Sequence, residues 1–292
     1  MYDICCIGHL TLDKVVTTRS TVHMAGGTSF YFSNAIHHMN IRYRLVTGIA
    51  ASEMKFVNEL RNKGIAVTVL PSKHTVYFEN TYPENPDYRI QRVLQKADPF
   101  AVAQLAGLEA RIFHLGPLLA DDMPVALIRS LSKKGKLSLD VQGYLREVRG
   151  ADVCAVDWPE KKEALRYITY LKANEHEMEV ITGQRDVRKA AVILFDWGVK
   201  EVVITLGSMG SVIYDGIQFY DIPAYVPEKI IDVTGCGDTY MAGYLYQRSK
   251  NIPVQQAGEF AAAMATLKIG ASGPFTGTEA DVFELLMISE KA

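Results

Sequence analysis

Residues 230–246 read IIDVTGCGDTYMAGYLY and contain the most informative pattern in the chain. Gly235 and Gly237 flank Cys236, Asp238 follows at once, and the residues after it are typical of a helix. Glycines can turn their N–H groups toward a ligand, and a helix beginning near Asp238 adds the positive end of its dipole. Such a loop could stabilise the negative charge of a phosphoryl group during its transfer, and Asp238 could accept the proton of the attacking hydroxyl. Simple helix capping by Asp238 is about equally well supported by these residues alone.

The composition narrows the class of protein. The chain has 292 residues, is 48% hydrophobic and 22% charged, and carries a formal net charge of −2. It can therefore bury a large core, and it offers no electrostatic argument for binding nucleic acid or an anionic membrane. The four cysteines form no C-x-x-C pair, which disfavours a zinc site and a disulfide scaffold. No apolar run approaches the roughly 20 residues of a membrane span, and the N-terminus resembles a strand more than a signal peptide. We therefore expect a soluble, cytoplasmic protein.

Apolar runs rich in β-branched residues alternate with helical segments along the chain. The runs expected as buried strands are 3–8, 43–48, 65–70, 111–116, 136–141 and 202–207. The helical segments include 52–64 and 121–135, and after residue 200 we expect short strands at 210–216 and 217–223, then helices such as 254–270. This alternation predicts an α/β fold with a mostly parallel central sheet flanked by helices on both faces.

Two segments depart from that pattern. Residues 14–24 and 74–94 alternate apolar and polar residues and lack a helical period. They predict a small sheet of exposed antiparallel strands that projects from the main body as a lid. Because the chain shows no internal repeat and no low-complexity linker, we expect a single domain, 1–292, with the lid strands inserted within it.

Residues 171–179, LKANEHEME, place Asn174 and Glu177 three positions apart. If a helix begins near Asn174, both side chains lie on one face of its first turn. Glu177 could then reach a hydrated Mg²⁺, because this ion keeps several waters and takes few protein carboxylates. A capping box formed by the same two residues is the alternative, and it is better supported by these residues alone.

A second turn with two glycines occurs in ITLGSMGSVIYDG, residues 204–216. A strand leads through Gly207 and Gly210 to another strand, so a nucleotide phosphate or sugar could lie against the turn. An ordinary β-turn with glycines at positive φ is the simpler interpretation.

Gly26 and Gly27 join a polar strand to a helix in HMAGGTSFYFSNAI, residues 23–36. Asp13 lies shortly before, at the end of the first strand. Ligands of open α/β sheets bind at the carboxyl ends of strands, so Asp13 is a candidate for holding substrate hydroxyls beside the paired glycines. The structural alternative is a plain turn and helix start.

Several familiar signatures are missing from the sequence. The chain has no G-x-x-x-x-G-K-[ST], no G-x-S-x-G and no H-E-x-x-H, and no G-x-G-x-x-G follows the first strand. These absences argue against a P-loop enzyme, an α/β-hydrolase, a zinc protease and a dehydrogenase.

Taken in order, the motifs resemble those of the ribokinase-like (pfkB-type) carbohydrate kinase family, and the resemblance covers nearly the whole chain. The matching segments are IGHLTLD (7–13), AGG (25–27), LKANEHE (171–177), VVITLGSMG (202–210) and DVTGCGDTYMAGYL (232–245). The last is the most specific: the family usually has D-T-x-G-A-G-D, and here Cys236 replaces the alanine. Its backbone N–H is retained. The thiol is expected to be a small buried filler more than a group of lowered pKa at a helix N-terminus.

The resemblance implies the ribokinase-like fold and ATP-dependent transfer of the γ-phosphoryl group to an alcohol group of a sugar or polyol. By this resemblance Asp238 is the catalytic base, and the N–H groups of Gly235, Cys236 and Gly237 form an anion hole. The resemblance also implies that Asn174 and Glu177 organise Mg²⁺ and phosphate, with Glu177 acting through water. It implies that ATP is bound by Thr205, Gly207, Ser208 and Gly210, and that substrate is bound by Asp13, Gly26 and Gly27. A monovalent cation such as K⁺ is implied at Asp232 with the GASGP loop (270–274). The family's lid closes over substrate and in some members forms a dimer interface, which leaves a homodimer through the lid as an option.

One departure leaves the substrate open. Ribokinase itself has G-G-x-G-A-N, whose Asn touches the sugar, whereas this chain has GGTSFYFSN (26–34) with Asn34 farther into the helix. A nucleoside or an inositol-like ring is the alternative to a sugar, and a non-catalytic ligand sensor is a third interpretation that retention of Asp238 disfavours.

Asp140, Gln142 and Arg146 are candidate substrate contacts or parts of a structural network. The lid aromatics that could stack on a base are Tyr77, Phe78, Tyr82 and Tyr88.

Overall fold

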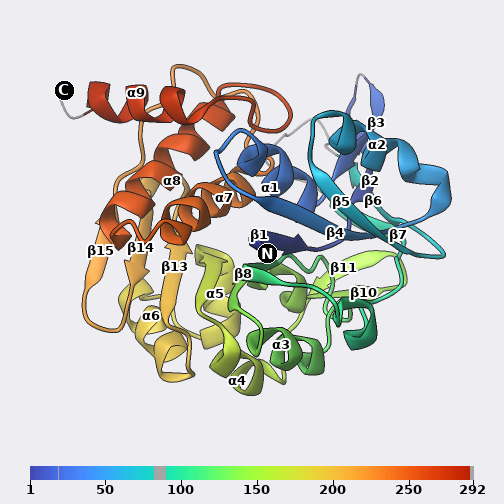
Figure 1. Cartoon of the computed structure of the whole chain (residues 1–292), viewed down its shortest axis with the longest axis horizontal. Helices are drawn as coiled ribbons and strands as arrows, with labels where there is room; N and C mark the ends of the chain where they lie inside the picture. The colour runs from blue at the N-terminus through green and yellow to red at the C-terminus, as the bar shows by residue number, and fades with distance from the viewer. Residues whose placement is uncertain (19, 82–89, 290–292) are drawn as a thin grey trace.

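Two β-sheets organise the chain (Figure 1). The structure is a computed structural model, and it describes residues 1–18, 20–81 and 90–289. The larger sheet has nine strands in the order β15-β14-β13-β12-β9-β8-β1-β4-β5. These strands are β1 (Tyr2–Ile7), β4 (Tyr43–Ile49), β5 (Ala66–Pro71), β8 (Ala110–Leu115), β9 (Lys136–Asp140), β12 (Tyr170–Asn174), β13 (Glu201–Thr205), β14 (Ser211–Tyr214) and β15 (Phe219–Ile222).

The central sheet confirms the predicted mostly parallel arrangement. Every neighbouring pair from β13 to β5 is parallel, and only β14 and β15 are added antiparallel at one edge. The apolar runs predicted as buried strands all form strands of this sheet. The sequence pattern did not predict β12, because Lys172 interrupts its apolar run. That lysine is nevertheless buried, where its Nζ donates to Asp140.

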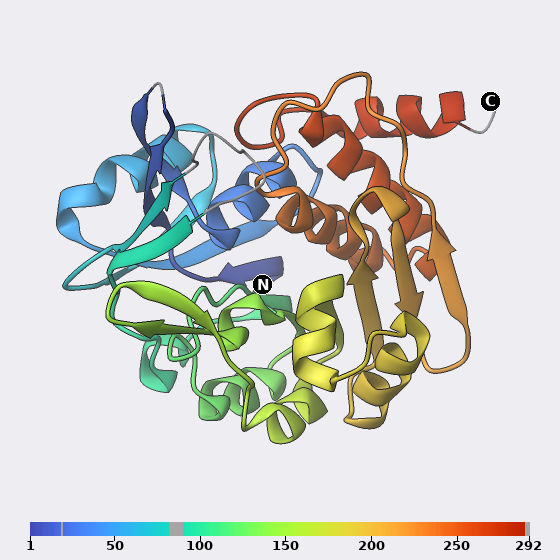
Figure 2. The ribbon, with the colours of Figure 1, turned by 180° about the vertical axis from the view of Figure 1, so that it is seen from behind.

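Helices cover both faces of the larger sheet, as Figures 1 and 2 show. One face carries α1 (Thr28–His37), α2 (Met54–Asn62), α7 (Cys236–Ser249), α8 (Val254–Ile269) and α9 (Glu279–Ser289). The other carries α3 (Val125–Ser132), α4 (Lys161–Ala164), α5 (Glu175–Thr182) and α6 (Val187–Asp196). Short 3₁₀ turns are η1 (Ala51–Glu53), η2 (Val102–Leu105), η3 (Val141–Leu145), η4 (Leu165–Tyr167) and η5 (Gly207–Met209). Within the described residues, no helix combines the length and the apolar character that crossing a membrane requires.

The smaller sheet is the expected lid, with strand order β10-β11-β7-β6-β2-β3. Its strands are β2 (Thr11–Val16), β3 (Thr21–Gly26), β6 (Val76–Thr81), β7 (Ile90–Gln95), β10 (Arg146–Arg149) and β11 (Asp152–Ala155). The prediction that its strands are all antiparallel was wrong, because β2 and β6 pair in parallel. Strand β2 follows β1 and strand β6 follows β5, and β1 and β5 run in the same direction in the larger sheet. The chain therefore enters β2 and β6 from the same end of that sheet and in the same direction. The hairpin of β10 and β11 was not predicted either.

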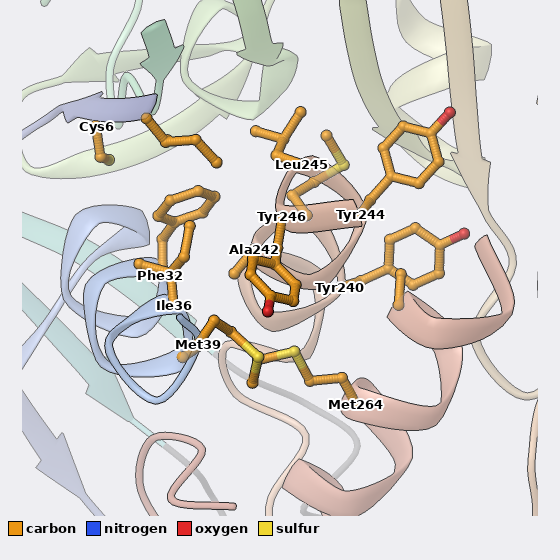
Figure 3. Close-up of a cluster of buried hydrophobic side chains, with 14 of the residues drawn as sticks. Cys6, Phe32, Ile36, Met39, Tyr240, Ala242, Tyr244, Leu245, Tyr246 and Met264 are labelled. Atoms are coloured by element: carbon orange, nitrogen blue, oxygen red, sulfur yellow. The ribbon is translucent and has the colours of Figure 1, made fainter. Parts of the chain in front are cut away.

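Helix α7 is fixed by the apolar core on its face of the sheet. Phe32 and Ile36 of α1, Leu245 of α7 and Met264 of α8 belong to one buried cluster (Figure 3). All four side chains are fully buried. Fully buried apolar side chains of this size each stabilise the fold by about 1.5–3 kcal/mol relative to exposure. Helix α7 is therefore packed against both α1 and α8 on this face of the sheet.

A buried ion pair ties the other end of α7 to the sheet. Arg248 Nε donates to Glu201 Oε2 at 3.0 Å, and Tyr244 Oη donates to the same oxygen at 2.6 Å. The Arg248 and Glu201 side chains are 18% and 12% exposed, so water screens the pair only weakly. Removal of one partner leaves a buried charge uncompensated, which is the costly case for an ion pair.

We expect Arg248→Met to lower the free energy of unfolding by about 3–5 kcal/mol, because Glu201 loses its cation. Chemical denaturation of both proteins measures the difference. The matched control is Arg188→Met, whose partner Asp221 is 67% exposed beside an Arg188 that is 51% exposed. Such a pair contributes at most about 1 kcal/mol. Equal losses in the two variants would contradict the assignment of Arg248 as an anchor.

Candidate active site

The carboxyl ends of three neighbouring strands form the floor of the candidate site. In the sheet register, Lys172 of β12 lies opposite Asp140 of β9, and Asn174 lies opposite Thr205 of β13. Parallel strands bring their carboxyl ends to a common edge, where ligands of open α/β sheets bind. The sheet therefore gathers residues that are far apart in the sequence onto one edge.

The glycine loop begins α7 and packs tightly on two sides. Gly235 is the N-cap residue with φ of 77°, and a Cβ there would lie 2.2 Å from Cδ1 of Tyr31. A Cβ on Gly237 would lie 3.0 Å from Nζ of Lys172. Both glycines thus permit a close approach that other residues obstruct. The helix predicted from about Asp238 starts at Cys236, whose own N–H donates to the Val233 carbonyl oxygen at 3.3 Å, and no side chain caps its N-terminus.

The thiol of Cys236 shows no sign of activation. Burial raises the pKa of Cys236 to about 12, and the nearby Lys268 only partly opposes this effect. The group is therefore a neutral thiol at ordinary pH. This result favours the interpretation of Cys236 as a small filler in place of alanine.

Lys172 is the most important site residue that the sequence analysis missed. Its side chain is only 7% exposed, and its Nζ donates to Asp140 Oδ2 at 2.9 Å and lies 4.0 Å from Glu177 Oε2. Burial alone would lower the pKa of Lys172, but the nearby carboxylates, led by Asp140, raise it above its ordinary value. Lys172 is therefore a permanent positive charge beside Gly237. A lysine inside a strand of apolar residues was the available signal, since lysine is seldom fully buried unless paired.

Asp238 is a carboxyl group tuned toward neutral pH. Burial and then the Asp140 carboxylate raise the pKa of Asp238 to about 7, against the opposing effects of Lys172 and a hydrogen bond with Thr28. A group with such a pKa exchanges protons readily at physiological pH, as a general base requires. Thr28, the first residue of α1, is a second site residue that the sequence analysis did not identify.

Asn174 and Glu177 form the capping box that the sequence favoured. Asn174 Oδ1 accepts from the Glu177 N–H at 2.8 Å, and Glu177 Oε2 accepts from the Asn174 N–H at 2.8 Å. The other carboxylate oxygen of Glu177 accepts from Gln142 Nε2 at 3.2 Å. The pair therefore begins α5 and at the same time holds a carboxylate near Lys172. A role for it with Mg²⁺ stays a prediction.

The described residues contain no group of three or more His, Cys, Asp or Glu side chains that could hold a metal ion on its own. A Mg²⁺ that arrives with phosphates needs no such cluster, because it takes one or two protein carboxylates and completes its shell with water and phosphate oxygens. Glu177 is the carboxylate predicted for that role, and in this structure both of its oxygens accept hydrogen bonds from Gln142 and Asn174.

The three predicted substrate residues lie together. The Thr11 hydroxyl donates to Asp13 Oδ1 at 2.5 Å, and a Cβ on Gly26 would lie 2.4 Å from Asp13 Oδ2. Gly27, with φ of 89°, then leads directly into Thr28, whose side chain lowers the pKa of Asp238. The chain thus connects the Asp13 carboxylate to Asp238 through a single tight turn.

The turn of Thr205, Gly207, Ser208 and Gly210 has the geometry of an ordinary structural turn. Gly207 and Gly210 have φ of 58° and 87°, and the Leu206 N–H donates to the Gly210 carbonyl at 2.8 Å. A Cβ on Gly210 would lie 2.1 Å from the Ile222 carbonyl oxygen. Both glycines therefore have a structural reason to be there. Thr205 lies beside Asn174, which leaves contact with a nucleotide as a prediction.

Asp232, the expected ligand of a monovalent cation, is already bound by an ammonium group. Lys268 Nζ donates to the Asp232 carbonyl oxygen at 2.6 Å and lies 3.1 Å from Asp232 Oδ2. The residues at this position therefore do not fit an additional cation.

The remaining predicted contacts have mostly structural positions. Asn34 is buried, donates to the Phe30 carbonyl and accepts from Lys63, so it cannot face a sugar. Asp140 and Gln142 belong to the network around Lys172, whereas Arg146 begins lid strand β10. Phe78 is buried in the lid, and the Tyr77 hydroxyl bonds to His23. Tyr82 and Tyr88 lie outside the described residues.

Comparison with known proteins identifies the family and the fold. The sequence model of the pfkB family carbohydrate kinases matches residues 47–281. A cytidine kinase of Thermococcus kodakarensis is 28% identical over 265 residues, which cover 88% of this chain and 92% of that protein. A pyrophosphate-dependent kinase in the ribokinase family, solved with a pyrophosphate analog and myo-inositol, has a TM-score of 0.87 and 28% identity, covering 96% of this chain and 99% of its own. Arabidopsis thaliana ribokinase with ribose and ATP shares the fold, with a TM-score of 0.81, 19% identity and 98% coverage of both chains.

We expect Asn174→Ala to lower the free energy of unfolding by about 1 kcal/mol, because the first turn of α5 loses its side-chain cap. Asn174→Ser is the matched control, since serine supplies an acceptor and should retain most of the stability. Denaturation of the two variants measures the effect. If both lose stability equally, the capping bond does not account for the role of Asn174 in the fold.

Proposed function

Because the chain belongs to the pfkB family of carbohydrate kinases, which transfer phosphate to an alcohol acceptor, we propose that it phosphorylates a hydroxyl group of a sugar or polyol with Asp238 as the base. The observation that carries the proposal is the position of Asp238. Its carboxyl group lies at the N-terminus of α7, has its pKa raised to about 7 by burial and Asp140, and is joined to the Asp13 cluster through Thr28.

The proposed reaction needs little from the protein beyond position and charge. The acceptor hydroxyl gives its proton to Asp238 as its oxygen bonds to the terminal phosphorus of the donor. The bond from that phosphorus to the bridging oxygen breaks, and the shortened donor leaves with the electron pair. The N–H groups of Gly235 and Gly237 would receive the charge that develops on the phosphoryl oxygens, whereas that of Cys236 donates to the Val233 carbonyl oxygen in this structure. Mg²⁺ bound with the donor would supply further charge neutralisation, held by Glu177 through water.

Lys172 would support this reaction in two ways. It is the cation nearest to Gly237, where a Cβ would lie 3.0 Å from its Nζ, so its charge adds to the field of the loop. It also opposes the effects that raise the pKa of Asp238. Without that opposition, burial and Asp140 would keep Asp238 protonated to higher pH and so inactive as a base.

The donor we propose is ATP. A pocket of about 430 Å³ between α8 and α9 is lined by the apolar side chains of Leu267, Phe275 and Leu285 and by the carboxyl groups of Glu228, Asp281 and Glu284. Its size is within the range of small-molecule sites. Because the pocket borders the last turn of α8, whose Lys268 binds Asp232 at the start of the glycine loop, we take it as a candidate for the base of a nucleotide. Pyrophosphate is the second candidate donor, supported by the 28% identity to a pyrophosphate-dependent kinase over 96% of this chain.

The acceptor class also has two candidates. In the described part of the lid, Phe78 is buried and Tyr77 bonds to His23, so neither supports stacking on a base. These contacts favour a sugar or a polyol such as an inositol. A nucleoside is the alternative, supported by the similarity to a cytidine kinase over 88% of this chain.

We expect one compound in a panel of sugars, inositols and nucleosides to drive turnover with Mg-ATP or Mg-pyrophosphate, followed by release of ADP or of orthophosphate. Asp238→Asn should lower kcat/KM about 10²–10⁴-fold, because the hydroxyl loses its proton acceptor. The matched control is Asp157→Asn, in an exposed pair with Lys161, which should leave kcat/KM unchanged. Undiminished turnover by Asp238→Asn would overturn the assignment of the base.

We expect kcat/KM to rise with pH through about 7 and to level off above it, because Asp238 acts only when ionised and burial raises its pKa to about 7. Lys172→Met should move this limb to higher pH, since the lysine charge lowers the pKa of Asp238. Lys172→Arg keeps the charge and serves as the control. A pH profile of Lys172→Met that is unchanged or moved to lower pH would contradict the role of Lys172.

A further inference from the structure

Lys268 places a buried ammonium group behind the glycine loop. It lies in the last turn of α8, and its side chain has no exposed surface. Nζ donates to the carbonyl oxygen of Asp232 at 2.6 Å and lies 3.1 Å from Oδ2 of the same residue. One cation thus binds a main-chain and a side-chain oxygen of the residue that starts the loop.

Asp232 connects this cation to three segments of the chain. Its Oδ1 accepts from the Thr234 N–H at 2.9 Å, and its Oδ2 accepts from the Gly273 N–H at 3.1 Å. The preceding N–H, that of Ile231, donates to the Ile269 carbonyl at 2.9 Å. The glycine loop, the end of α8 and the loop 270–274 therefore meet at a single ion pair.

The chemistry of this ion pair is that of a monovalent cation site. A lysine ammonium carries one positive charge and three donors, and oxygen atoms of carbonyl and carboxylate groups satisfy it. Its place in the last turn of α8 is also favourable, because the C-terminus of a helix attracts cations. A dissolved cation at the same oxygens would meet a like charge at contact distance in a buried setting, which is strongly unfavourable.

We propose that Lys268 is a tethered replacement for a dissolved monovalent cation, so that the glycine loop is held in place without K⁺ or NH₄⁺. Lys268 is a positioning residue: it acts on the loop through Asp232. For its effect on phosphoryl transfer the proposal rests on the proposed function, but its effect on the loop and on stability does not.

The first test is the thermal midpoint in chloride salts of tetramethylammonium, Na⁺, K⁺ and NH₄⁺ at equal ionic strength. The wild type should show the same midpoint in all four salts. Lys268→Ala should have a lower midpoint that rises in K⁺ or NH₄⁺, because truncation leaves space and bare oxygens for a small cation. Lys268→Met removes the charge but fills the space, so its midpoint should be lower and unresponsive. Lys250→Ala, in a partly exposed pair with Glu279, is the control that should not respond to the cation.

The second test is turnover on the acceptor identified by the substrate panel. The wild type should keep its rate in tetramethylammonium, and Lys268→Ala should lose at least about tenfold and recover most of it in K⁺ or NH₄⁺. A several-fold activation of the wild type by K⁺ would overturn the proposal, as would a folded Lys268→Ala that responds to no cation. If Lys268→Ala does not fold, the response of the wild type decides. If no acceptor is turned over, the proposed function fails while the thermal midpoints still decide the role of Lys268.

Discussion

The candidate site depends on one buried ammonium group, that of Lys172. Asp140, Glu177 and Asp238 all act on it electrostatically, and three carboxylates this close could not remain ionised together in a partly buried site without a cation among them. Asp140 is the direct partner at 2.9 Å, which leaves Asp238 raised to a pKa of about 7 but still able to ionise. The lysine therefore gives the two carboxyl groups different roles: Asp140 is its ion-pair partner, and Asp238 can exchange a proton.

The scaffold explains why this balance can be held. Strand β12 lies between β9 and β13, so its register fixes Lys172 beside Asp140. Helix α7 is packed against α1 and α8, and Gly235 meets the ring of Tyr31 at a distance that leaves no room for a side chain. At the far end of α7, Arg248 binds Glu201 of β13. The loop and the strand edge are thus parts of one packed unit, and their separation does not depend on a ligand.

The sequence predicted the features that depend on local pattern. The apolar strands and the start of α7 near Asp238 follow from period and glycine placement, and the capping box follows from the spacing of Asn174 and Glu177. Features that depend on a distant partner were missed or misjudged. Lys172 breaks the apolar pattern of its strand, and its burial is explained only by the ion pair with Asp140, which the fold brings beside it. The hairpin of β10 and β11 extends a lid sheet whose other strands come from distant parts of the chain. Likewise, Asp232 could not be recognised as occupied without Lys268, which lies 36 positions later.

The two buried lysines act on the two ends of the same loop. Lys268 binds Asp232, where the loop starts, and Lys172 lies against Gly237, where α7 takes over. A loop that binds a phosphoryl group must keep its N–H groups aimed at a developing charge, and any reorientation during the reaction adds to the barrier. Positive charges that are covalently part of the chain oppose such reorientation before a donor arrives. In the proposed mechanism, the preorganisation of the glycine loop would therefore come from two lysines of the core, Lys172 and Lys268.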